Sequence, residues 1–150
     1  MKVAVVGHGK TGREVEAILR ERGHEPVLRA RGADFPAGCV VGIDFTRADA
    51  VVANTRAALK AGARYVIGTT GWDAQLDDVR RLVEEAQGGL VHAPNFSLGV
   101  HLFYRVVRDA ARLFAPFAQY DPYILERHHR QKKDAPSGTA RALARILEAS

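Results

Sequence analysis

The sequence predicts an α/β fold in which helices cover both faces of a parallel β-sheet, followed by the start of a second, α+β region. Two observations support this prediction. Short apolar runs rich in β-branched residues alternate with stretches of helical periodicity, and a glycine-rich turn joins the first run to the first helix. Strands and helices that alternate in this way are typical of parallel sheets with right-handed crossovers.

The expected strands follow the apolar runs of the first hundred residues. These runs cover residues 3–6, 26–31, 40–45, 65–67 and 90–93. Most of them show little polar and apolar alternation, which is typical of strands with both faces buried.

The expected helices fill the intervals between the strands, at residues 12–22, 48–61 and 74–87. Gly23, Gly62 and Gly88 follow these stretches, and a glycine at that place is typical of a helix C-terminus. Asp73 precedes the third stretch and is its candidate N-cap.

The pattern changes after Ser97. The sequence there predicts a helix at 99–115, a single strand at 123–125, a polar segment at 126–136 and a final helix at 137–149. Two domains are therefore expected. Residues 1–97 form the first, and residues 98–150 form the N-terminal part of the second.

The composition is that of an ordinary globular protein, with 47% hydrophobic and 26% charged residues and a formal net charge of +5. No apolar run approaches the roughly 18 residues that a membrane span needs, and the N-terminus lacks a cleavage pattern for secretion. Cys39 is the single cysteine, so an internal disulfide is excluded. These features favour a cytoplasmic protein. The basic net charge alone does not show whether its partner is nucleic acid, a membrane surface or a small anion.

The turn after the first strand reads Gly7-His8-Gly9-Lys10-Thr11-Gly12 and matches the pattern G-x-G-x-x-G. Its glycines allow a tight turn and a close approach of the backbone, and the following helix N-terminus offers free N–H groups to a pyrophosphate. Because the pattern lies between a strand and a helix, it predicts a dinucleotide-binding domain with a doubly wound, Rossmann-type sheet.

The end of the second strand carries Arg29 and Arg31, where an acidic residue would select NAD. Arginine pairs well with a 2′-phosphate, so NADPH is expected to be at least tolerated, with NADH as the other candidate cofactor. The alternative is that one or both arginines are simply solvated.

Two polar turns follow later strands, at the sheet edge where ligands of parallel sheets bind. Their candidate cofactor-binding residues are Gly68, Thr69, Thr70, Ala93, Pro94, Asn95 and Phe96. The alternative is that both are only tight turns with helix caps. Asp44 and Thr46, at the end of another strand, are weaker candidates, for which a helix cap is the favoured interpretation.

The segment from Glu126 to Ala140 combines histidines and lysines with an expected helix N-terminus. Histidine and lysine can exchange protons or supply charge, and the backbone of Gly138 and Thr139 can hold a carboxylate, so an anionic substrate is predicted. A solvated charged loop is the alternative. No metal site is predicted, because further ligands at suitable spacing are missing, and the cluster lacks the aromatic residues of a nucleic-acid platform.

Five segments together resemble one known family. They are Gly7-His8-Gly9-Lys10-Thr11-Gly12, Ile43-Asp44-Phe45-Thr46, Gly68-Thr69-Thr70-Gly71, residues 95–100 and residues 126–140. The sequence is similar to the dihydrodipicolinate (4-hydroxy-tetrahydrodipicolinate) reductases, which are enzymes of lysine and diaminopimelate biosynthesis.

The resemblance implies roles for individual residues. His128 corresponds to a general acid or base and Lys132 to a proton donor, while His129, Gly138 and Thr139 correspond to binders of the dicarboxylate substrate. The glycine loop and the two later turns correspond to contacts with the nicotinamide cofactor.

The implied activity is the NAD(P)H-dependent reduction of 4-hydroxy-tetrahydrodipicolinate, through dihydrodipicolinate, to tetrahydrodipicolinate, in a cytoplasmic homotetramer. No nucleic acid or membrane partner is implied. Two alternatives stay open, namely an inactive nucleotide-binding fragment and a dehydrogenase of another small dicarboxylate. Family members extend further than residue 150, and the sequence does not decide between NADPH and NADH.

Overall fold

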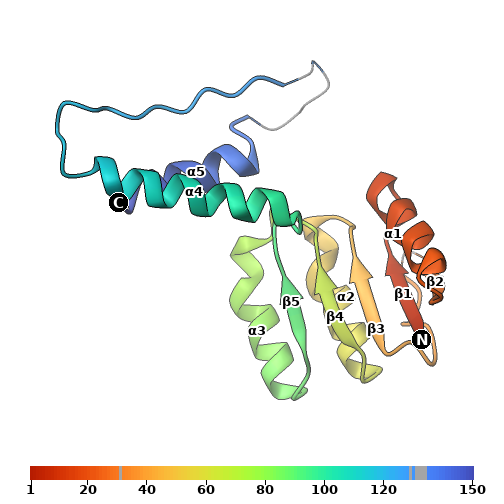
Figure 1. Cartoon of the computed structure of the whole chain (residues 1–150). Helices are drawn as coiled ribbons and strands as arrows, with labels where there is room; N and C mark the ends of the chain where they lie inside the picture. Colours follow the sequence, from red (N-terminus) through yellow and green to blue (C-terminus); the bar gives the residue numbers. More distant parts are fainter. Residues whose placement is uncertain (31, 129, 131–134) are drawn as a thin grey trace. The chain divides into compact units, whose positions relative to one another are not determined.

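The computed structural model of the chain describes residues 1–30, 32–128, 130 and 135–150. Within it the chain divides into two compact units, Met1–Pro94 and Asn95–Ser150. Figure 1 traces both along the sequence.

The first unit is built on a five-stranded sheet. Its strands are β1 (Lys2–Val6), β2 (Glu25–Arg29), β3 (Val41–Asp44), β4 (Arg64–Ile67) and β5 (Leu90–His92). All neighbouring strands are parallel, in the order β2-β1-β3-β4-β5. β2 lies on one side of β1, and β3, β4 and β5 follow on the other side, so the strand order changes direction at β1. Folds of this class bind ligands beyond the carboxyl ends of the strands at such a switch point.

Helices cover both faces of this sheet (Figure 1). They are α1 (Lys10–Glu21), the 3₁₀ turn η1 (Ala48–Ala50) with α2 (Val51–Lys60), and η2 (Asp73–Gln75) with α3 (Leu76–Glu85). The α1 face forms a core around Val3, Val5 and Leu19. The α2 and α3 face forms the larger core, which includes Val51 and Val79. The predicted doubly wound parallel sheet is confirmed.

Two of the three glycines predicted to end the helices of the first unit have the expected backbone conformation. Gly23 and Gly62 have φ of 73° each, the left-handed conformation that glycine adopts without a steric cost. After α3 this conformation falls on Gln87 instead, at φ 46°, ahead of the predicted Gly88. The prediction of Asp73 as N-cap is wrong, because Asp73 is already the first residue of η2 and makes no capping bond.

The second unit contains α4 (Leu98–Phe114) and α5 (Gly138–Glu148), which pack against each other. Ser97 and Ser137 are the N-caps of these helices. The Ser97 hydroxyl accepts from Val100 N at 3.5 Å, and the Ser137 hydroxyl accepts from Ala140 N at 3.0 Å. The predicted strand at 123–125 is wrong, because those residues form no strand and pair with no other strand in the described part of the chain. Local β-propensity does not form a strand without a partner to accept its backbone hydrogen bonds.

Candidate functional site

The glycine loop lies between β1 and α1, as predicted. Gly7 has φ of 96°, and a Cβ there would stand 2.5 Å from the Phe45 carbonyl oxygen. A Cβ on Gly12 would stand 1.9 Å from the Gly7 carbonyl oxygen, so α1 begins directly against the loop. Gly9, by contrast, has no heavy atom within 4 Å of an ideal Cβ. The chain therefore requires glycine at two of the three positions for its own packing, and leaves open space at the third.

The N-terminus of α1 is open in the described structure, since its N-cap Gly9 has no side chain to bond the first-turn N–H groups. Lys10 and Thr11 are exposed there. Free N–H groups beside open space and an exposed lysine suit a pyrophosphate. These residues therefore fit a dinucleotide.

The His8 side chain lies against α1 rather than free above the loop. Its Nε2 stands 2.8 Å from Glu16 Oε2, and Glu16 Oε1 accepts a bond from Arg20 at 2.5 Å. Hydrogen bonding from Arg20, and then from His8, lowers the pKa of Glu16. His8 thus tethers the loop to the helix that follows it.

A buried carboxylate, Asp44, stands at the carboxyl end of β3 with no exposed surface. Its Oδ1 accepts from the Thr46 hydroxyl and backbone N at 2.6 and 2.8 Å and from the Thr69 hydroxyl at 2.9 Å. Its Oδ2 accepts from Tyr65 Oη at 2.8 Å and Asn54 Nδ2 at 3.0 Å. The helix-cap interpretation of Asp44 and Thr46 is wrong, since Arg47 is the N-cap of η1.

The turn after β4 is tied to this carboxylate. The Thr69 hydroxyl accepts from Thr46 N at 2.8 Å while donating to Asp44, and the Thr69 carbonyl accepts from Trp72 Nε1 at 2.8 Å. A Cβ on Gly68 would stand 2.1 Å from the Phe45 ring. Thr70, in contrast, is exposed. In this turn, Thr70 presents its side chain to solvent while Thr69 holds the backbone in place.

The predicted turn after β5 crosses the boundary of the two units. Ala93 and Pro94 end the first unit, with Pro94 exposed. In the second unit, Asn95 Oδ1 accepts from Ser97 N at 2.8 Å, and Phe96 is 48% exposed. The Asn95 side chain therefore shapes the turn before α4 through one oxygen, and its amide NH₂ remains a donor group.

Arg29 ends β2, as predicted, and is half-buried. Its Nη1 donates to Asn54 Oδ1 on α2 at 2.5 Å. The interpretation of Arg29 as merely solvated is therefore wrong. Arg31 lies outside the described residues.

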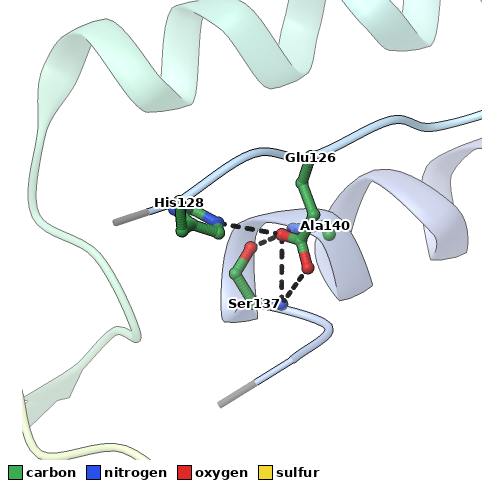
Figure 2. A network of polar contacts seen from close by, with 4 residues as sticks. All are labelled: Glu126, His128, Ser137 and Ala140. Carbon is green, nitrogen blue, oxygen red and sulfur yellow. Dashed lines mark hydrogen bonds and ion pairs between the residues drawn. The ribbon is translucent and has the colours of Figure 1, made fainter. Parts of the chain in front are cut away.

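The second unit holds His128 at the N-terminus of α5 (Figure 2). His128 Nε2 stands 3.1 Å from Glu126 Oε2, and both Glu126 oxygens accept from Ser137 N, at 3.0 and 3.2 Å. Hydrogen bonding from Ser137 holds the pKa of Glu126 below its usual range, and the bond from His128 adds to this. Sequence reasoning did not single out Glu126, which joins the candidate acid to the start of the helix.

Gly138 and Thr139 form the first turn of α5, with Gly138 exposed and without any atom within 4 Å of an ideal Cβ. N–H groups in the first turn of a helix have no partner within the helix, so these two suit an anion. The other two predicted residues of this segment, His129 and Lys132, lie outside the described residues.

No group of three or more His, Cys, Asp or Glu side chains among the described residues is arranged to hold a metal ion. No helix in the same part of the chain is long and apolar enough to cross a membrane.

A parallel sheet with the order β2-β1-β3-β4-β5 and a glycine loop between β1 and α1 defines a Rossmann-type nucleotide-binding domain. Comparison with known families gives a narrower assignment. The family model described as "Dihydrodipicolinate reductase, N-terminus" matches residues 26–96, and "Dihydrodipicolinate reductase, C-terminus" matches residues 99–150. The chain belongs to the dihydrodipicolinate reductase family, which confirms the resemblance seen in the sequence.

Individual relatives agree with this assignment. The chain is 41% identical over 140 residues to the 4-hydroxy-tetrahydrodipicolinate reductase of Methanosarcina barkeri, covering 93% of this chain and 49% of that protein. It is 44% identical over 110 residues to that of Methanothermobacter thermautotrophicus, covering 72% of this chain and 39% of the relative. The chain thus spans about half or less of the length of these curated relatives.

A solved structure is also similar. It is a dipicolinate-bound dihydrodipicolinate reductase from Paenisporosarcina sp. TG-14, with a TM-score of 0.70 and 31% identity. The match covers 99% of this chain and 66% of that one.

Proposed function

We propose that the protein takes part in the NAD(P)H-dependent reduction of 4-hydroxy-tetrahydrodipicolinate, through dihydrodipicolinate, to tetrahydrodipicolinate, in lysine and diaminopimelate biosynthesis. The observation that carries the proposal is the arrangement of His128, Glu126 and the α5 N-terminus in a chain of this family. The relatives bear the name of this reductase, and the similar structure is described as bound to dipicolinate, a small dicarboxylate.

NADPH or NADH, when bound, supplies the hydride. The first unit binds and orients this cofactor. The open N-terminus of α1 receives the pyrophosphate, and the space above Gly9 allows its close approach. Thr70 and the turn from Ala93 to Phe96 offer the nicotinamide end hydroxyl, amide and backbone groups. Fixing the donor beside the substrate makes the reaction effectively unimolecular.

The second unit handles the substrate's charge and proton. The N–H groups of Gly138 and Thr139 bind a carboxylate at the positive end of α5. The ionised Glu126 can only accept, so His128 Nε2 carries the hydrogen of their 3.1 Å contact, and Nδ1 is the ring atom that exchanges a proton with the substrate. We assign His129 to the same carboxylate site and Lys132 to proton donation.

Oxidation of NADPH, followed at 340 nm with freshly generated substrate, tests this proposal. His128→Gln and Lys132→Ala should each lower turnover by more than about tenfold, roughly 1.4 kcal/mol of barrier, with NADPH binding unchanged. His24→Gln, which changes a histidine just before β2, is the matched control and should keep full turnover. Normal turnover in either site variant removes that residue from the mechanism.

The same assay separates the two other candidate functions. Cofactor binding without turnover favours a nucleotide-binding fragment, and turnover with other dicarboxylates alone favours a different dehydrogenase. Light scattering tests the homotetramer that we propose for the active cytoplasmic enzyme.

A further inference from the structure

Asn54 lies between two charged side chains of the first unit. Its Nδ2 donates to Asp44 Oδ2 at 3.0 Å and lies 3.3 Å from the Thr46 hydroxyl, while its Oδ1 accepts from Arg29 Nη1 at 2.5 Å. A carboxylate accepts only and a guanidinium donates only, so these two neighbours leave the amide a single orientation. The Asn54 oxygen must face Arg29.

Asp44 is itself held in place. It has no exposed surface, and Tyr65 donates to it at 2.8 Å from β4. Burial, and then the Asp44 charge, raises the pKa of Tyr65, so the phenol keeps the proton that it donates. Tyr65 therefore fixes the position of the buried Asp44 carboxylate, and Asp44 fixes that of the Asn54 amide. The Asn54 oxygen in turn holds the Arg29 guanidinium.

Arg29 has donors left over after this contact. Its Nε is buried without a hydrogen-bond partner among the described residues, so the donors that a ligand can reach lie at the Nη1 and Nη2 end of the half-buried side chain. Arg29 ends β2, whose neighbour β1 leads into the glycine loop. At this edge the adenosine ribose of a dinucleotide lies in folds of this class. A guanidinium with a fixed plane and spare donors suits the bidentate recognition of a phosphate.

We propose that Asn54 is a positioning residue that favours the binding of NADPH over that of NADH, by holding the Arg29 guanidinium where it meets the adenosine 2′-phosphate. This inference rests on the proposed function, because it assumes that a nicotinamide dinucleotide binds to the glycine loop. Holding Arg29 in advance reduces the conformational entropy that it would otherwise lose on binding a phosphate.

A purely structural role for Arg29 makes a different prediction. If the guanidinium serves only to balance the buried charge of Asp44, then replacing Arg29 or Asn54 lowers the melting temperature and leaves the ratio of NADPH to NADH affinity as it was. The ratio of the two dissociation constants is therefore the readout that separates positioning from support.

The test is fluorescence titration of the full chain with NADPH and with NADH, for Arg29→Ala, Asn54→Ala and the double variant. Arg29→Ala should weaken NADPH binding by at least about tenfold and leave NADH binding unchanged, as expected for a lost hydrogen bond to a charged group. Asn54→Ala should weaken NADPH binding by about three- to tenfold, again with NADH unchanged. The double variant should match Arg29→Ala, because Asn54 acts through Arg29.

Two further variants keep the test decisive if Asn54→Ala does not fold. Arg29→Lys keeps the charge near Asp44 but lacks the planar fork, and should lose NADPH preference while keeping its fold. Thr55→Val is the matched control on α2. Thr55 is fully buried, its hydroxyl has no hydrogen-bond partner in the described structure, and its replacement should leave the ratio unchanged.

An unchanged NADPH to NADH ratio in Asn54→Ala or Arg29→Lys overturns the inference, as does a double variant that loses more preference than Arg29→Ala alone. A wild-type chain that binds neither cofactor is a separate result, which overturns the proposed function itself.

Discussion

Replacing Gly9 by alanine should separate cofactor binding from folding at the glycine loop. Gly9 is the N-cap of α1 with φ of −75°, which an alanine adopts without strain, and its Cβ would meet no heavy atom within 4 Å. The methyl group would instead occupy the space that we assign to the pyrophosphate. Gly12→Ala is the contrasting change, because its Cβ would stand 1.9 Å from the Gly7 carbonyl oxygen.

The expected magnitudes differ accordingly. Alanine at an N-cap costs up to about 1 kcal/mol relative to glycine, so Gly9→Ala should lower the melting temperature by no more than about 4 °C. Crowding a packed interface costs about 1–3 kcal/mol, which at the cofactor corresponds to a loss of NADPH affinity of roughly 5- to 150-fold. In Gly12→Ala the backbone must move by roughly 1 Å, and about 1–3 kcal/mol is lost from the fold itself.

Thermal unfolding followed by circular dichroism gives the stability change, and calorimetric titration with NADPH gives the affinity. Gly9→Ala should keep its fold and lose affinity, while Gly12→Ala should lose stability. Wild-type NADPH affinity in Gly9→Ala would falsify the placement of the pyrophosphate above this residue.

Three further outcomes are expected. Tyr65→Phe removes a donor from the buried Asp44 and should lower the free energy of unfolding by about 1–3 kcal/mol in urea titrations; a change below about 0.5 kcal/mol contradicts the buried bond. The lowered pKa of Glu126 means that its contribution to stability is present above the unfolded carboxyl pKa of about 4.3 and disappears as pH falls through the folded value. Glu126→Gln should therefore flatten the loss of melting temperature between about pH 5 and pH 3, and an identical acid profile refutes this. Glu126→Gln should also shift the pH profile of turnover, since it removes the charged partner of His128, whereas a purely structural Glu126 leaves that profile in place.

Most of the sheet was predictable because its signals are local. Each strand of the first unit falls on an apolar run, and the strands are parallel because helices separate them along the chain. The strand predicted at 123–125 was wrong for the opposite reason. Tyr123 and Ile124 have strong β-propensity, but pairing depends on a neighbouring strand, and they are 87% and 37% exposed.

The candidate site was predictable as a set of segments and less so as a set of contacts. The sequence places the glycine loop and the 126–140 segment, since each is contiguous. It does not show that Tyr65 and Asn54 reach Asp44 from 21 and 10 residues away, or that Glu126 bonds Ser137 across 11 residues. These contacts exist only once helices and strands are packed, so no spacing rule indicates them.

The Asp44 carboxylate collects donors from the turn after β3, from α2, from β4 and from the turn after β4. The effects of substitutions at the residues that donate to Asp44 therefore depend on one another. In a combinatorial library, exchanging Asn54 or Tyr65 singly leaves the Asp44 carboxylate short of a donor, so such changes should cost more stability alone than together with a change of Asp44. Changing Arg29 alone to alter cofactor preference leaves the Asn54 oxygen without its hydrogen-bond donor. Arg29 and Asn54 are therefore best varied together.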